Sequence, residues 1–127
     1  MKQSIIRSGL GLLGVLAAVT AASPAFAVAS VGGAKIQSIT TRTTNFAWIR
    51  FDRLFDTMSS FCVQTNMMVI PLNTDAGRAM LSQVTAAFLA GKTVYAEGTA
   101  GAASTACVSG HVDGTAERMG SLILLQQ

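Results

Sequence analysis

The first 27 residues have the pattern of a segment that is removed before the rest of the chain folds. Two cations precede an uncharged apolar stretch at 10–22, and Ala25 and Ala27 then place small side chains at alternate positions, as a signal peptidase requires. This pattern predicts a cleavable signal peptide at 1–27 and a single mature domain at 28–127. A retained membrane anchor is the alternative, but the apolar stretch is shorter than the roughly 20 residues that span a bilayer. We therefore expect no membrane span after cleavage and a periplasmic or secreted location.

Loss of the leader also changes the charge. The full chain carries nine Lys and Arg against six Asp and Glu, a formal net charge of +3. Lys2 and Arg7 belong to the leader, so the mature domain keeps seven basic residues against the same six acids, a net charge of +1. The remaining cations are scattered singly, whereas nucleic-acid binding needs clustered Lys and Arg. We expect no nucleic-acid partner.

The mature domain contains two cysteines, Cys62 and Cys107. In an oxidising compartment, an even pair in a small domain predicts a disulfide. The bond would close a loop of about 46 residues, which is worth roughly 4 kcal/mol on a chain-entropy estimate. A redox pair is the alternative, but redox cysteines usually have Cys-x-x-Cys spacing. We therefore interpret the pair as structural.

One helix is expected in the mature domain. Asn73 or Thr74 can cap its first free backbone amides, and Gly91 is a natural stop. The apolar side chains that recur at steps of three or four residues form one stripe: Ala76, Met80, Val84 and then Ala87 or Phe88. The helix should therefore cap a core.

Runs rich in β-branched and aromatic residues predict strands around the helix, at 35–41, 45–51, 66–72, 92–98 and 118–125. The order β-β-β-α-β-β predicts a β-rich α+β fold, a small five-stranded OB-like barrel with one helix between its third and fourth strands. A small α+β sandwich is the alternative.

No constellation of catalytic or metal-binding residues stands out. His111 lies in an alternation with Ser109 and Asp113, but successive side chains on one strand face seldom converge on a reacting atom. Structural zinc needs four Cys or His ligands, and no Gly-rich phosphate loop joins a strand to a helix. The carboxylates are isolated along the chain. We expect no enzymatic activity, no cofactor and no metal.

A polar turn offers the candidate binding site. Arg42, Thr43, Thr44 and Asn45 lie close to Trp48 in the sequence. Hydroxyls, an amide and a guanidinium beside an indole can hydrogen-bond to and stack on sugars, so these residues are the candidate glycan-binding set. The alternative is an ordinary hairpin turn with Trp48 in the core.

The region around the helix resembles a known family. The segments IPLNTDAGRAML at 70–81 and AAFLAGKTVY at 86–95 are similar to small secreted domains of the subtilase cytotoxin B subunit type, in which a strand leads through a polar turn into an Ala-rich helix. The resemblance implies an OB-like barrel with a disulfide. In the toxin members it implies a ring of five subunits that grips sialylated glycans and carries a catalytic subunit. No sugar-binding residue is carried over from that family to this chain.

Three functional hypotheses follow. The first is an exported, non-enzymatic binding or assembly module whose partner is a glycan or a protein. The second is a toxin-type receptor-binding subunit that forms a homo-oligomeric ring. A small periplasmic enzyme is a remote third.

Overall fold

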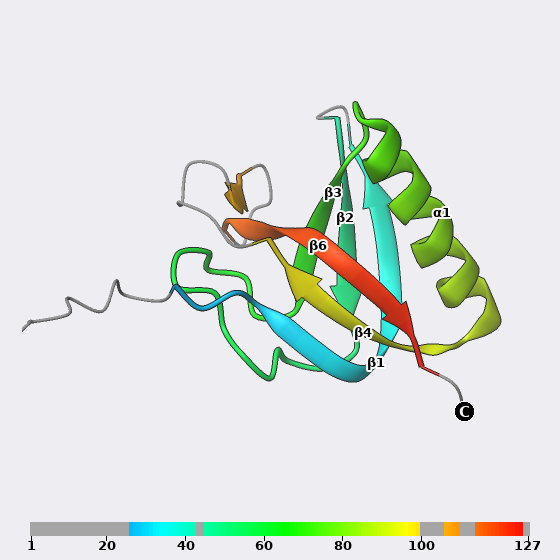
Figure 1. Cartoon of the computed structure of the whole chain (residues 1–127), viewed down its shortest axis with the longest axis horizontal. Helices are drawn as coiled ribbons and strands as arrows, with labels where there is room; N and C mark the ends of the chain where they lie inside the picture. The colour runs from blue at the N-terminus through cyan, green and yellow to red at the C-terminus, as the bar shows by residue number, and fades with distance from the viewer. Residues whose placement is uncertain (1–25, 43–44, 100–105, 110–113, 126–127) are drawn as a thin grey trace, which may run out of the picture.

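The computed structural model describes residues 26–42, 45–99, 106–109 and 114–125. Six strands and one helix follow one another in this part of the chain (Figure 1): β1 (Ser30–Thr41), β2 (Phe46–Phe51), β3 (Met67–Pro71), α1 (Asp75–Ala90), β4 (Thr93–Gly98), β5 (Cys107–Val108) and β6 (Ala116–Leu124). The predicted leader lies almost wholly outside the described residues, so its cleavage stays a prediction. Within the described ranges, no helix is long and apolar enough to cross a membrane.

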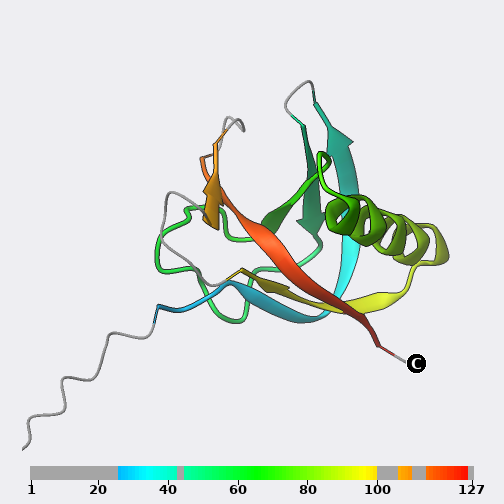
Figure 2. The ribbon, with the colours of Figure 1, turned by 45° about the horizontal axis from the view of Figure 1, so that its top comes forward.

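The strands form one sheet in the order β3-β2-β1-β4-β6-β5. Neighbours in this order run antiparallel. One further pairing, which is parallel, joins β3 to β6 and places Met68 opposite Glu117 and Val69 opposite Arg118. The first strand of this sheet order, β3, therefore lies beside the last but one, β6, as Figure 2 shows for the green β3 and the red β6.

β1 is the longest of the described strands and pairs with two other strands. Its C-terminal part pairs with β2, and its N-terminal part pairs with β4. The register shifts between Ile36 and Ser38 in the first pairing and between Val31 and Ala34 in the second. Gly33 lies within the second shift and has a φ of 61°. Such irregularities bend a strand and increase its twist, which allows β1 to pass from one partner to the other.

The fold class predicted from the sequence is confirmed at the level of a β-rich domain with one helix. Each of the five expected strands is present, but the expected count was wrong because β5 adds a sixth. A strand of two residues carries no periodic pattern, and the sequence therefore could not reveal it. β1 also begins at Ser30, earlier than the predicted 35–41.

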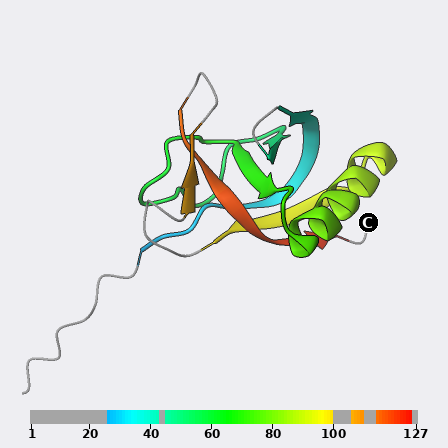
Figure 3. The ribbon, with the colours of Figure 1, turned by 90° about the horizontal axis from the view of Figure 1, so that it is seen from above.

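Both ends of α1 are fixed by the residues that the sequence indicated. Thr74 is the N-cap, and its side-chain oxygen accepts a hydrogen bond of 3.0 Å from the Gly77 amide. Gly91 ends the helix with a φ of 62°, a left-handed conformation that glycine adopts without strain. The helix packs against β1, β3 and β6 (Figure 3).

The buried stripe of α1 is rotated from the expected one. Gly77, Val84 and Ala87 are buried, whereas Ala76 and Phe88 are exposed. Gly77 faces the strands because its missing side chain lets the helix approach the carbonyl group of Pro71: a Cβ atom there would overlap the Pro71 oxygen. The first turn of the helix is therefore seated directly on the end of β3.

The buried apolar residues form two clusters on opposite faces of the strands. On β2, alternate residues Ala47, Ile49 and Phe51 belong to the main core, which α1 also contacts. Trp48, which points to the other face, belongs to a second cluster with these residues: Met67, Val69, Val108 and Ala116. The alternation of side chains along a strand accounts for this division.

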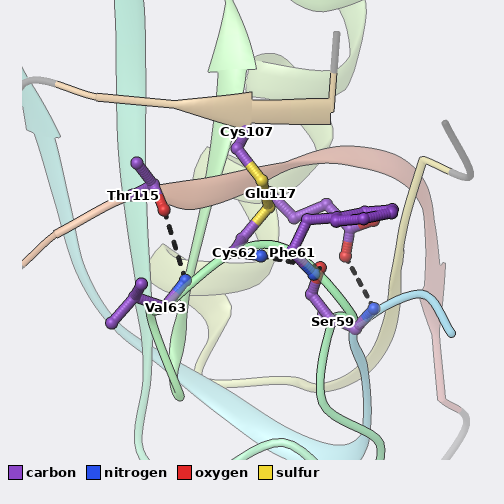
Figure 4. The surroundings of a disulfide bond; sticks show 8 residues. Ser59, Phe61, Cys62, Val63, Cys107, Thr115 and Glu117 are labelled. Atoms are coloured by element: carbon purple, nitrogen blue, oxygen red, sulfur yellow. Dashed lines mark hydrogen bonds between the residues drawn. A yellow bond between two sulfur atoms is a disulfide. The ribbon is translucent and has the colours of Figure 1, made fainter. Parts of the chain in front are cut away.

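The predicted disulfide between Cys62 and Cys107 is confirmed, with 5.4 Å between the two Cα atoms. Figure 4 shows that it ties the connection between β2 and β3 to β5. Val63 of the same connection donates its amide hydrogen to the Thr115 carbonyl at 3.0 Å. The connection at 52–66 is therefore held against the β5–β6 region by a covalent bond and by hydrogen bonds. Figure 1 shows this region at one end of the molecule and α1 at the other.

We expect Gly77→Ala to lower the free energy of unfolding by about 1–3 kcal/mol, because the new Cβ must displace the Pro71 backbone. This sign opposes helix propensity, which favours Ala over Gly by about 1 kcal/mol. Urea unfolding measures the change. Gln83→Ala at an exposed helix position is the control and should stay within about 0.5 kcal/mol of wild type. A more stable Gly77→Ala protein would contradict the seating of α1 on β3.

Removal of the disulfide should cost about 2–4 kcal/mol of unfolding free energy, because the unfolded chain then loses a closed loop. The Cys62→Ala, Cys107→Ala double variant tests this by urea unfolding. A reducing agent should lower the free energy of unfolding of the wild-type protein and leave that of the double variant unchanged. Equal effects of reductant on both proteins would argue against the bond.

Candidate ligand-binding face

The residues predicted to bind a ligand fall at the β1–β2 turn and on the adjoining strand. Arg42 and Asn45 are exposed on either side of this turn, and Thr43 and Thr44 lie outside the described residues. The Asn45 carbonyl accepts a hydrogen bond of 2.8 Å from the Leu72 amide, which ties Asn45 to the chain just after β3. The role of these four residues in binding stays a prediction.

Trp48 occupies a different environment from the rest of the predicted set. Its side chain is fully buried in the second cluster, where Val108 of β5 and Ala116 of β6 also pack. Its rings are therefore not exposed to a ligand in this structure. The arrangement matches the alternative interpretation of the sequence, a hairpin turn with Trp48 in the core.

On the face of β2 that carries Trp48, the strand register places another aromatic residue, Phe46, beside a cation, Arg118. Trp48 pairs with Val69, and Val69 pairs with Arg118, so β2, β3 and β6 contribute side chains in one row. The guanidinium carbon of Arg118 lies 5.5 Å from the centre of the Phe46 ring. This is the geometry of a cation–π contact.

Both members of this contact are half-buried, so each retains a surface toward solvent. Within the part of the chain that the structure describes, the Nε atom of Arg118 is buried and has no hydrogen-bond partner. Phe46 directly follows the exposed Asn45, which brings the pair to the edge of the predicted turn. We define the cation–aromatic face as Phe46 and Arg118 together with Arg42 and Asn45.

Sequence reasoning missed Phe46 and Arg118 as a pair. The two residues are far apart in the chain, and their contact depends on the parallel pairing of β3 with β6. The Lys and Arg residues of the mature domain are scattered singly, so no local sequence pattern distinguished Arg118 from the others. An aromatic residue beside the polar turn was the available signal, and Phe46 is closer to that turn than Trp48 is.

Glu117 lies on the opposite side of β6 from Arg118 and is 3% exposed. Its carboxylate accepts a hydrogen bond of 2.6 Å from the Ala29 amide. Burial raises the pKa of Glu117 above 4.5, and the Ala29 hydrogen bond opposes this rise. Gly98 leaves the space that the carboxylate occupies, since a Cβ atom at that position would overlap it.

Other site chemistry is not apparent in the described ranges. No group of three His, Cys, Asp or Glu side chains there could hold a metal ion, and no pocket opens among these residues. His111 and Asp113 lie outside the described residues, so the predicted polar alternation around them is not tested. Searches against protein-family models, curated proteins and solved structures found nothing that matches this chain.

We expect Trp48→Ala to lower the free energy of unfolding by about 3–5 kcal/mol, because it leaves a cavity in the second cluster. Arg42→Ala, at an exposed position of the same candidate set, should change it by less than about 0.5 kcal/mol. Chemical denaturation of the two variants provides the comparison. Wild-type stability of Trp48→Ala would show that the indole is not part of a packed core.

Proposed function

We propose that this chain is an exported, non-enzymatic binding module with an OB-like barrel, and that it binds carbohydrate on the cation–aromatic face. The observation that carries the proposal is the Arg118 guanidinium lying over the Phe46 ring, next in sequence to the exposed Asn45. Further support comes from the strand order, the chemistry of the face and the disulfide.

The strand pairings support an OB-like barrel. They run from β1 to β2, β3, β6 and β4, and β4 pairs again with β1. The single helix of the described ranges falls between β3 and β4. In OB-folds, the face of the second and third strands and the loop between the first two strands bind oligosaccharides and oligonucleotides. The cation–aromatic face takes Phe46 from β2 and Asn45 from the connection between β1 and β2, and Arg118 joins it from β6, the parallel neighbour of β3.

The chemistry of this face suits a sugar. A sugar presents hydroxyl groups, which need both donors and acceptors, and apolar C–H surfaces, which pack on aromatic rings. Asn45 supplies an amide donor and acceptor, Arg118 supplies planar donors, and Phe46 supplies the ring. The near-neutral mature domain argues against an oligonucleotide, which would need a stronger positive field.

The disulfide supports the exported location, because such bonds persist mainly in oxidising compartments. The N-terminal sequence pattern points to the same location. Together they favour the periplasm or the extracellular medium over the cytoplasm.

A ring-forming receptor-binding subunit is the alternative proposal. Large apolar side chains are exposed at the end of α1, at Phe88 and Leu89, and near the end of β6, at Ile123 and Leu124. Exposed apolar surface of this kind is typical of association sites. Light scattering of the exported protein distinguishes the proposals: a pentamer mass favours the ring, and a monomer mass favours the stand-alone module.

The binding proposal is tested by a glycan array with the exported protein. Arg118→Gln and Phe46→Leu should each weaken the best hit at least about ten-fold, or about 1.4 kcal/mol, since the first removes the charge and the second removes the π-system at similar volume. Lys92→Gln, at the far end of α1, is the control for charge loss and should bind as wild type does. No hit for the wild-type protein, or equal binding by Arg118→Gln, would refute a carbohydrate ligand on this face.

A further inference from the structure

The environment of Glu117 suggests a role for the mature N-terminus. The carboxylate is almost fully buried and receives its hydrogen bond from Ala29, two residues beyond the predicted cleavage point. Glu117 is the β6 residue that pairs with Cys107 of β5, and Figure 4 shows it beside the disulfide. A buried carboxylate is costly to ionise unless a positive charge or several donors compensate it.

The described residues offer no such positive charge to Glu117. The ion pairs within these ranges join Arg53 to Asp56 and Arg78 to Asp75, and neither involves Glu117. Arg118 is next in sequence, but its side chain lies over Phe46 on the other side of β6. Glu97 on the neighbouring β4 is a further acid. A cation that forms only when the chain is cleaved, the new α-amine, would supply the compensating charge.

The backbone before Ala29 places a nitrogen atom near the carboxylate. The Ala29 nitrogen lies 2.6 Å from Oε2 of Glu117, and one residue of chain spans at most about 3.6 Å. The Val28 nitrogen is therefore within about 6 Å of that oxygen, a separation at which an opposite charge favours the ionised carboxylate.

The chain beyond the cleavage point is fixed independently of the leader. The Gly98 amide donates to the Ala29 carbonyl at 2.7 Å, and the Ser30 amide donates to the Thr57 carbonyl at 3.0 Å. Both bonds join residues of the mature domain to one another, so neither depends on a leader residue. The residues at the end of the leader interact elsewhere, because the Phe26 ring lies 4.8 Å from that of Phe61 and Ala27 exchanges hydrogen bonds with Ser60. Cleavage removes both of these interactions from the mature domain.

We propose that Glu117 is the receptor for the α-ammonium group of Val28, and that cleavage after Ala27 creates the ion pair that fastens the mature N-terminus. The cleavage adds one water across the Ala27–Val28 amide, leaving a carboxylate on Ala27 and an amine on Val28 that is protonated at neutral pH. A charge-assisted bond inside the mature domain thereby takes the place of the ring packing and hydrogen bonds that Phe26 and Ala27 supplied. This inference rests on the export part of the proposed function and not on the carbohydrate ligand.

The test begins with protein exported by its own leader. The intact mass of the exported protein should identify Val28 as its first residue. NMR titration should then show the pKa of the Val28 α-amine raised above its ordinary range of about 7.7–8.0. In Glu117→Gln, that pKa should return to the ordinary range, because the neutral amide can still accept the Ala29 hydrogen bond but no longer attracts the ammonium. Glu97→Gln is the matched control and should leave the amine as in wild type.

A second measurement separates the ion pair from a merely structural role of Glu117. A Gly-Ser insertion after Ala27 moves the new amine two residues away and leaves every side chain of the mature domain unchanged. Glu117→Gln should lower the Tm by at least about 4 °C in protein that begins at Val28, and should leave it unchanged or raise it in the extended protein.

The inference is overturned by an α-amine pKa that is the same in wild type and Glu117→Gln. An equal Tm effect in the two N-terminal forms would overturn it as well, and so would a mature chain that begins at another residue. Failure of the glycan array would leave these readouts untouched. The ligand and the N-terminal ion pair are therefore judged separately.

Discussion

The parallel contact between β3 and β6 is the interaction on which the arrangement of this molecule depends. It joins the first three strands to the last two through the pairs Met68 with Glu117 and Val69 with Arg118. Arg118 thereby reaches Phe46, while Glu117 turns to the opposite side of the strand. A shift of β6 by one residue would exchange the two sides and bury a guanidinium where the carboxylate now lies. Both the proposed ligand face and the proposed N-terminal ion pair follow from this one register.

Features governed by neighbouring residues could be predicted from the sequence. The cap at Thr74 and the stop at Gly91 depend on local hydrogen bonds and local backbone conformation. The pairing of Cys62 with Cys107 followed from the predicted compartment and from the absence of another cysteine in the sequence. The β-rich class with one helix followed from the residue periodicity.

Features that depend on contacts between distant strands could not be predicted in the same way. The sequence carries no indication of which strand β6 meets, so the contact of Arg118 with Phe46 was missed. The sequence does not reveal that Val108 of β5 packs on the same face of β2 as Trp48. Without this contact Trp48 could lie at the surface, and it was therefore included in the candidate ligand-binding set. The buried environment of Glu117 similarly requires the space left by Gly98 on another strand.

The pair of hydrogen bonds between Ala27 and Ser60 bears on the order of events during biogenesis. Proteases act on extended backbone that is free to enter their active sites, whereas here both backbone polar groups of Ala27 are engaged by Ser60. A peptidase that cuts after Ala27 must therefore act before the segment around Ser60 has settled. If the predicted leader is cleaved there, precursor molecules that fold early would keep it, and the rate of translocation relative to folding would set the yield of processed protein.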